Sequence, residues 1–167
     1  MSRRRITGLL LIGALSLAAI AVPARAENPP NPWLHRRVLS IAHAGGENEA
    51  PHTTLFAYKR AAALGTDVLE MDVRLAGDGT LVAHHDATVD ATTEATGRVD
   101  TLTYPELYAL DHGYKFTEDR WSCGDCPEAE YIYRGVRTGD KPPPAGYVAE
   151  DFTIPSVEAL FTTFPDA

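Results

Sequence analysis

The chain has 167 residues, with 15 basic and 23 acidic side chains and a formal net charge of −8. Such an acidic composition argues against nucleic-acid binding, because proteins hold nucleic acid chiefly through lysine and arginine. The length suits one domain with a sizeable core, and the sequence shows no internal repeat or low-complexity tract. We therefore expect one acidic domain that does not bind nucleic acid.

The first 26 residues have the three parts of a secretory signal peptide. A basic start, Arg3–Arg5, precedes an apolar run over residues 6–22 and the small-x-small site Ala24-Arg25-Ala26. The run is short and interrupted for a membrane span, and no stop-transfer sequence follows it. We expect export to a secreted or periplasmic location without a stable membrane anchor, by either the Sec or the Tat route.

Cleavage after Ala26 would leave 11 basic and 23 acidic side chains, a net charge of −12. An anionic substrate would then need a local cation to offset the charge of the protein. A Pro-rich leader at 27–36 separates the signal peptide from the expected domain at 37–167.

The first elements of the domain predict a βαβ unit. Residues 37–43 form a short apolar run that predicts a buried strand, closed by Gly45-Gly46. Thr53 or Thr54 caps an expected helix over 55–64 that ends at Gly65. Because a strand follows at Asp67, the order strand, helix, strand indicates a parallel α/β sheet.

Residues 67–86 carry the polar side chains of greatest interest. A two-residue period puts Glu70 and Asp72 on one strand face, and the Asp78-Gly79 turn predicts a hairpin that returns His85 toward them. Such acidic strand faces are most often merely solvated. Two carboxylates are also a partial shell for a hard divalent cation, and a nearby histidine could move protons.

A second histidine favours the functional interpretation. His43 ends the first predicted strand, and functional groups gather at the carboxyl ends of parallel strands. We therefore expect His43, Glu70 and Asp72 at one rim of the sheet, as metal-assisted hydrolysis requires.

Four stretches of the sequence together resemble the glycerophosphodiester phosphodiesterase family. The resemblance implies a TIM (β/α)8 barrel of the phospholipase C-like phosphodiesterase type, Ca²⁺ or Mg²⁺ as cofactor, and hydrolysis of a glycerophosphodiester to glycerol 3-phosphate and an alcohol. By position it implies that His43 is the general base and His85 the general acid, and that Glu70 and Asp72 are metal ligands. The matching stretches are IAHAGG at 41–46, residues 51–99, residues 102–116, and DFTIPSVEAL at 151–160.

Some positions depart from the family pattern. Ala44 stands where the family usually has an arginine that would contact phosphate, and Ala91 also replaces an arginine. His52 and His84 align with no catalytic position, so we interpret both as structural or surface residues. His35 and His112 carry no functional signal.

The length is a further departure. A TIM barrel takes about 250 residues, and the resemblance stops after the second barrel strand and its following helix. We expect the front part of a longer enzyme, with a third acidic metal ligand on a later strand. The 167-residue chain alone is then expected to be inactive.

Residues 111–151 are irregular, and we expect a surface loop or inserted region near the mouth of the site. Within it, Cys123 and Cys126 could form a local disulfide, a redox-active pair or half of a zinc site. Export of the chain favours the disulfide.

Two other functions fit the same residues. One is a phosphodiesterase of the same barrel acting on phosphoinositides or sphingomyelin. The other is a catalytically degenerate module that binds phosphate or metal. The attacking group could be water or the glycerol's own hydroxyl, and the head group and oligomeric state are open.

Overall fold

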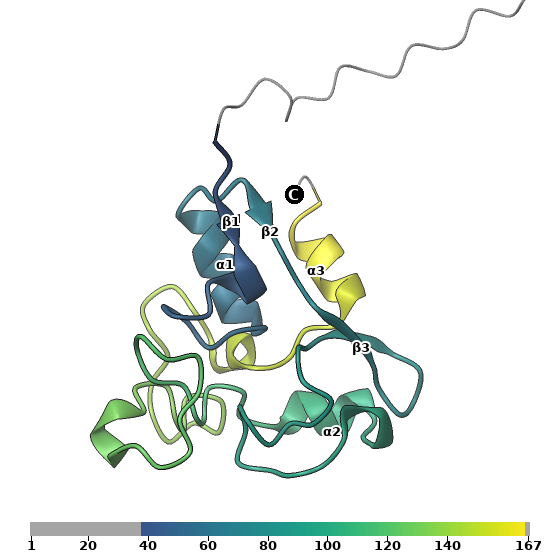
Figure 1. Ribbon diagram of the computed structural model, residues 1–167, viewed down its shortest axis with the longest axis vertical. Helices are drawn as coiled ribbons and strands as arrows, with labels where there is room; N and C mark the ends of the chain where they lie inside the picture. Colours follow the sequence, from purple (N-terminus) through teal and green to yellow (C-terminus); the bar gives the residue numbers. More distant parts are fainter. Residues whose placement is uncertain (1–37, 166–167) are drawn as a thin grey trace, which may run out of the picture. The chain divides into compact units, whose positions relative to one another are not determined.

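The computed structural model describes residues 38–165 (Figure 1). The predicted signal peptide, the Pro-rich leader and His35 lie outside the described residues. Within the described part of the chain, no helix is long and apolar enough to cross a membrane.

The chain begins with the predicted βαβ unit. Strand β1 (Ile41–Ala42) is followed by helix α1 (Leu55–Ala63) and strand β2 (Val68–Leu69). The two strands are parallel, with Ile41 opposite Val68. This arrangement confirms the parallel α/β unit expected from the sequence.

Helix α1 begins and ends where its local chemistry predicts. The Thr54 side chain accepts a hydrogen bond from the Ala57 amide at 3.2 Å, which satisfies one of the free amides of the first turn. Gly65, at φ +80°, follows the last turn in a left-handed conformation. The buried face of the helix consists of Phe56, Ala57, Tyr58 and Ala61.

The hairpin is also present, but the long strand predicted to lead into it is not. Strands β3 (Val73–Leu75) and β4 (Leu81–Ala83) pair antiparallel around the predicted turn. Residues 70–72 form a link that belongs to neither strand, because the chain pairs with β1 in β2 and with β4 in β3. At its two ends the Glu70 amide donates to the Ala42 carbonyl at 3.1 Å and the Asp72 carbonyl accepts from the His84 amide at 3.0 Å. Glu70 and Asp72 therefore lie on this link and not on a strand face.

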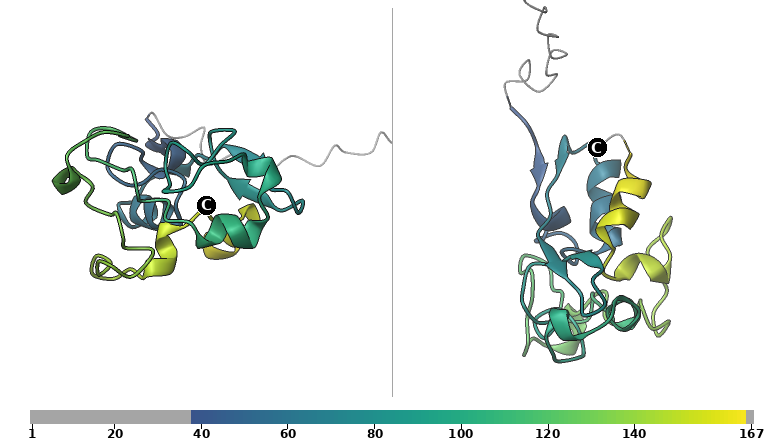
Figure 2. Two further views of the ribbon diagram at one scale, coloured as in Figure 1. Left: turned by 90° about the horizontal axis from the view of Figure 1, so that it is seen from below. Right: turned by 90° about the vertical axis from the view of Figure 1, so that its right-hand side faces the viewer.

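The expectation of a buried first strand is wrong. Ala42 is buried, but Ile41 is 59% exposed and Val38 is 85% exposed. Helices α1 and α3 (Val157–Thr163) lie on the same side of the strands (Figure 2), so only one face of β1 is covered. Among the described residues the strands form two separate two-stranded sheets and do not close a barrel.

The core consists of three apolar clusters. The first joins the hairpin to η3 (Val99–Thr101) and α2 (Tyr104–Ala109) through Val82, Val89 and Leu107. The second packs α1 against the later irregular segment. The third packs Tyr58 of α1 and Ala83 of β4 against Leu160 of α3.

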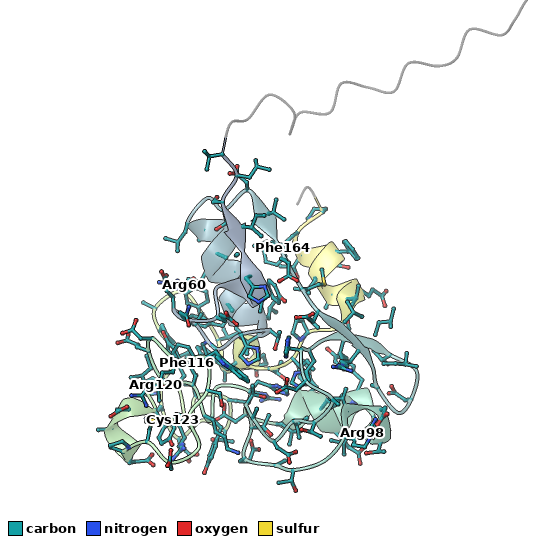
Figure 3. The ribbon with its side chains drawn as sticks, viewed as in Figure 1. Arg60, Arg98, Phe116, Arg120, Cys123 and Phe164 are labelled. Carbon is teal, nitrogen blue, oxygen red and sulfur yellow. A yellow bond between two sulfur atoms is a disulfide. The ribbon has the colours of Figure 1, made fainter. Side chains whose placement is uncertain are left out.

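Residues 111–151 carry only 3-10 turns, η4 (Glu128–Glu130) and most of η5 (Ala149–Phe152). The segment is more than a surface loop, because Phe116 and Val136 are buried and Val136 packs in the cluster of Phe56 and Phe152. Cys123 and Cys126 form a disulfide, which is the pairing that the sequence favoured among the three alternatives. Phe116 and Cys123 mark the segment in Figure 3.

Candidate active site

His43 lies immediately after β1, in the short helix η2 (His43–Gly45). Ala44, Gly45 and Gly46 all have positive φ, so the backbone turns sharply after His43. A Cβ on Gly45 would lie 2.9 Å from the Cβ of Ala57, which is too close for any residue with a side chain. The turn thus packs directly against α1.

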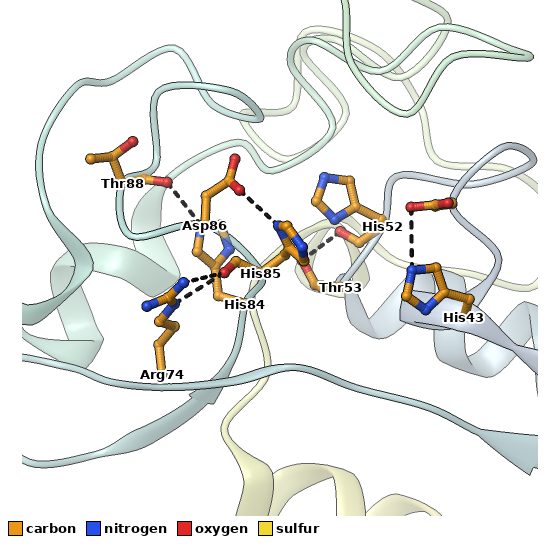
Figure 4. A network of polar contacts seen from close by, with 9 residues as sticks. His43, His52, Thr53, Arg74, His84, His85, Asp86 and Thr88 are labelled. Atoms are coloured by element: carbon orange, nitrogen blue, oxygen red, sulfur yellow. Dashed lines mark hydrogen bonds and ion pairs between the residues drawn. The ribbon is translucent and has the colours of Figure 1, made fainter.

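This turn brings His43 onto Glu70. One oxygen of Glu70, Oε2, accepts hydrogen bonds from His43 Nδ1 at 2.8 Å and from the Ala44 amide at 2.9 Å. Figure 4 shows His43 together with His85 and Asp86. A carboxylate can only accept, so Nδ1 carries the proton and Nε2 of neutral His43 has a free lone pair. Glu47 lies 4.0 Å from that Nε2.

His85 follows β4 and has a carboxylate partner of its own. Its Nδ1 donates to Asp86 Oδ1 at 2.7 Å, and this hydrogen bond raises the pKa of His85, with Asp72 adding to the effect. Arg74 fixes the backbone beneath the ring, because its Nε and Nη2 donate to the His85 carbonyl at 3.0 and 2.6 Å. His85 is thus held in place and favoured in its protonated form.

The structure brings His43 and His85 to one cavity of about 200 Å³. The sequence alone did not give Glu47 or the role of Asp86, because both depend on contacts formed after folding. Trp121 belongs to the irregular segment 111–151 and lines this cavity, which agrees with the expectation that the segment lies near the mouth of the site. The lining residues are His43, Ala44, Glu47, His52, His85 and Trp121.

Glu70 and Asp72 are not among the residues that line this cavity; Asp72 lies on the 70–72 link, where its charge adds to the raised pKa of His85. Its backbone carbonyl accepts a hydrogen bond from the His84 amide at 3.0 Å, so the hairpin return reaches the acidic link as predicted. Its Oδ2 is buried and has no hydrogen-bond partner. A buried carboxylate oxygen needs a donor or a cation, so Asp72 fits a role as a ligand.

A complete metal shell is not formed by the described residues alone, which contain no cluster of three or more potential ligand side chains. Glu70 and Asp72 provide the hard oxygen donors that Ca²⁺ and Mg²⁺ prefer. The two residues fit a divalent cation as part of its shell.

The remaining described histidines are buried, so the surface alternative for His52 and His84 is wrong. Burial lowers the pKa of His52 to about 4 and that of His112 to about 3, and it also lowers the pKa of His84. His84 and His112 pack edge to face, with ring centroids 5.9 Å apart. These three rings are neutral packing groups near the site, unlike the exposed His43 and His85.

Comparisons with known proteins identify the family of the chain. The model of the Glycerophosphoryl diester phosphodiesterase family matches residues 43–166, and the chain belongs to this family. A glycerophosphodiester phosphodiesterase of Caldanaerobacter subterraneus is 48% identical over 82 residues, which cover 49% of this chain and 34% of that protein.

Two solved structures share the fold. One is the glycerophosphoryl diester phosphodiesterase domain of a Mycobacterium tuberculosis protein, with a TM-score of 0.57. The other is an Oleispira antarctica phosphodiesterase in complex with the product sn-glycerol-3-phosphate, with a TM-score of 0.53. Each is 24% identical, and the match covers 77% of this chain and 40% of the other. The chain thus spans roughly a third to two fifths of the length of these relatives.

Proposed function

We propose that this chain supplies the acid–base pair of an enzyme that hydrolyses glycerophosphodiesters to glycerol 3-phosphate and an alcohol. The observation that carries the proposal is that His43 and His85 line one cavity, each with Nδ1 held by a carboxylate. Holding Nδ1 leaves Nε2 of each ring as the atom for proton transfer.

The two histidines have different tasks in the proposed reaction. Glu70 orients the ring of His43 through Nδ1, so that Nε2 is the atom that would accept the proton of the attacking hydroxyl. Asp86 raises the pKa of His85, so His85 is favoured as the protonated group that gives its proton to the leaving alkoxide. Each such transfer contributes on the order of 10²–10⁴ in rate.

Glu70 and Asp72 would hold a divalent cation, Ca²⁺ or Mg²⁺. When bound, the cation would offset the charge of the phosphodiester. The orphaned Oδ2 of Asp72 supports this assignment, and the acidic charge of the chain explains why a phosphodiester needs such a cation.

The relatives support the substrate class. The Caldanaerobacter protein that is 48% identical over the matched residues is named a glycerophosphodiester phosphodiesterase. The Oleispira structure contains the product sn-glycerol-3-phosphate. The alternative of a degenerate module rests on Ala44, which lines the cavity where the family usually has an arginine. The presence of both imidazoles and both carboxylates favours the enzyme.

The test measures glycerol 3-phosphate released from glycerophosphocholine by the full protein, from residue 1 to the last residue that its gene encodes. His43→Ala and His85→Ala should each lower kcat by at least about 100-fold, whereas Glu158→Gln on the exposed face of α3 should leave it unchanged. Circular dichroism establishes that the variants fold. Turnover near the wild-type rate in either histidine variant, or calcium binding by the wild type without any turnover, would refute the proposal.

We also propose that residues 1–26 direct export. A fusion that lacks them should remain in the cell, while the complete chain reaches the extracytoplasmic fraction. Equal export of the two fusions contradicts this proposal.

A further inference from the structure

Trp121 lines the same cavity as His43 and His85. It comes from the irregular segment, packs at right angles on His52 with ring centroids 4.9 Å apart, and remains 39% exposed. The indole is therefore supported by a buried neighbour while part of its surface faces the cavity that it lines.

The loops that carry Trp121 and Glu47 are joined to one another. The Asp119 amide donates to the Asn48 carbonyl at 3.2 Å, which ties the backbone before Trp121 to the backbone after Glu47. The disulfide of Cys123 and Cys126 closes the chain just beyond the tryptophan. An aromatic ring and a carboxylate are thus fixed at one rim of the cavity.

Glu47 is the only carboxylate among the residues that line the cavity, which also include His85 with its raised pKa. Glu47 is 34% exposed, and none of the lining residues is lysine or arginine. Arg74 is engaged by the His85 carbonyl, and the guanidinium of Arg120 contacts Cys126 Sγ at 3.2 Å. Among the lining residues the carboxylate of Glu47 has one basic neighbour, His43 Nε2 at 4.0 Å, and it has no lysine or arginine partner.

His52, beneath the indole, does not oppose a cation. Its pKa is lowered to about 4, first by burial and then by the neighbouring His84, so the ring is neutral at ordinary pH. Its Nε2 is buried without a partner. A neutral ring on one side and a carboxylate on the other are the surroundings in which an indole attracts an ammonium group.

We propose that Trp121 and Glu47 form the subsite for the alcohol part of the substrate, and that they select diesters whose alcohol carries an ammonium group, such as choline or ethanolamine. The inference rests on the proposed function, because the alcohol is the group that leaves next to His85. The tryptophan attracts the cation through its ring, and Glu47 through its charge. A neutral or anionic alcohol gains neither interaction.

A binding experiment tests the subsite without requiring turnover. The tryptophans of the 167-residue chain are Trp33 and Trp121, so in that chain Trp33→Phe leaves Trp121 as the indole reporter. Choline should change its emission saturably, and the uncharged carbon analogue 3,3-dimethylbutanol should bind at least about fivefold more weakly. Equal binding of both compounds, or no saturable response to choline, would overturn the inference.

Variants assign the effect to the two residues. By calorimetry Glu47→Gln and Trp121→Ala should each weaken choline binding on the order of five- to tenfold, and Trp121→Phe should restore part of the loss. Glu158→Gln is the matched control for a lost carboxylate. Choline affinity that is unchanged in both Glu47→Gln and Trp121→Ala contradicts the subsite.

Turnover gives the second measurement. In the full protein, Trp121→Ala should lower the ratio of kcat/KM for glycerophosphocholine to that for glycerophosphoglycerol by about tenfold. An unchanged ratio would overturn the inference and leave the proposed function intact. A wild-type protein that hydrolyses neither diester refutes the proposed function, and the binding experiment then decides the subsite by itself.

Discussion

The carboxylate of Asp86 offers the sharpest test of the acid–base assignment. Asp86→Asn keeps the shape of the side chain and an oxygen that can accept from His85 Nδ1, so it removes the charge while leaving the orientation of the ring. The side chain of His85 is 57% exposed and that of Asp86 is 32% exposed, and His85 Nδ1 lies 2.7 Å from Asp86 Oδ1. For a solvent-screened pair we expect a loss of about 0.2–1 kcal/mol, or at most about fivefold in the protonation equilibrium of His85.

The direction of the change follows from the hydrogen bond. Asp86 raises the pKa of His85, so the variant should lose the proton of His85 at lower pH than the wild type. In the full protein, the descending alkaline limb of kcat/KM should therefore move to lower pH. Nuclear magnetic resonance titration of the His85 ring nitrogens measures the same shift without turnover.

A matched control removes a different exposed ion-pair carboxylate. Asp100 pairs with Arg98 at 2.6 Å and makes no contact with His85, so Asp100→Asn should leave the His85 titration in place. A His85 midpoint that stays or rises in Asp86→Asn would refute the role assigned to Asp86.

Three further predictions concern the folded chain. Since burial lowers the pKa of His52 to about 4 and of His112 to about 3, the unfolded chain takes up protons first as the pH falls below about 6.5. On acidification from pH 7 toward 4 the free energy of unfolding should therefore fall by up to about 1.4 kcal/mol per histidine and pH unit, and the urea midpoint should fall with it. A rising midpoint contradicts this. Gly45→Ala, at φ +84° against α1, should lower the unfolding free energy by about 1–3 kcal/mol in urea titrations, and an unchanged value would show that the turn relaxes freely. Denatured exported protein should show no free thiol without reductant and two with it, from Cys123 and Cys126; two thiols without reductant argue against the disulfide.

The elements that the sequence predicted correctly are set by residues that lie close together in the sequence. Thr54 caps α1 because its hydroxyl reaches an amide three residues ahead, and Gly65 ends that helix because it adopts positive φ readily. The Asp78-Gly79 turn forms the hairpin for the same kind of local reason. The convergence of His43 with His85 follows from the βαβ order and this turn.

The tertiary structure decided which partner each segment takes. The alternating pattern after Asp67 predicts one long strand, but the chain pairs first with β1 and then with β4, which leaves Glu70 and Asp72 on a link. The pairing of Asp86 with His85 depends on side-chain orientation, and the cavity of Glu47 and Trp121 joins residues far apart in the chain. Local chemistry sets where helices and turns begin and end, whereas packing between distant segments sets which side chains meet and which charged groups lie near one another.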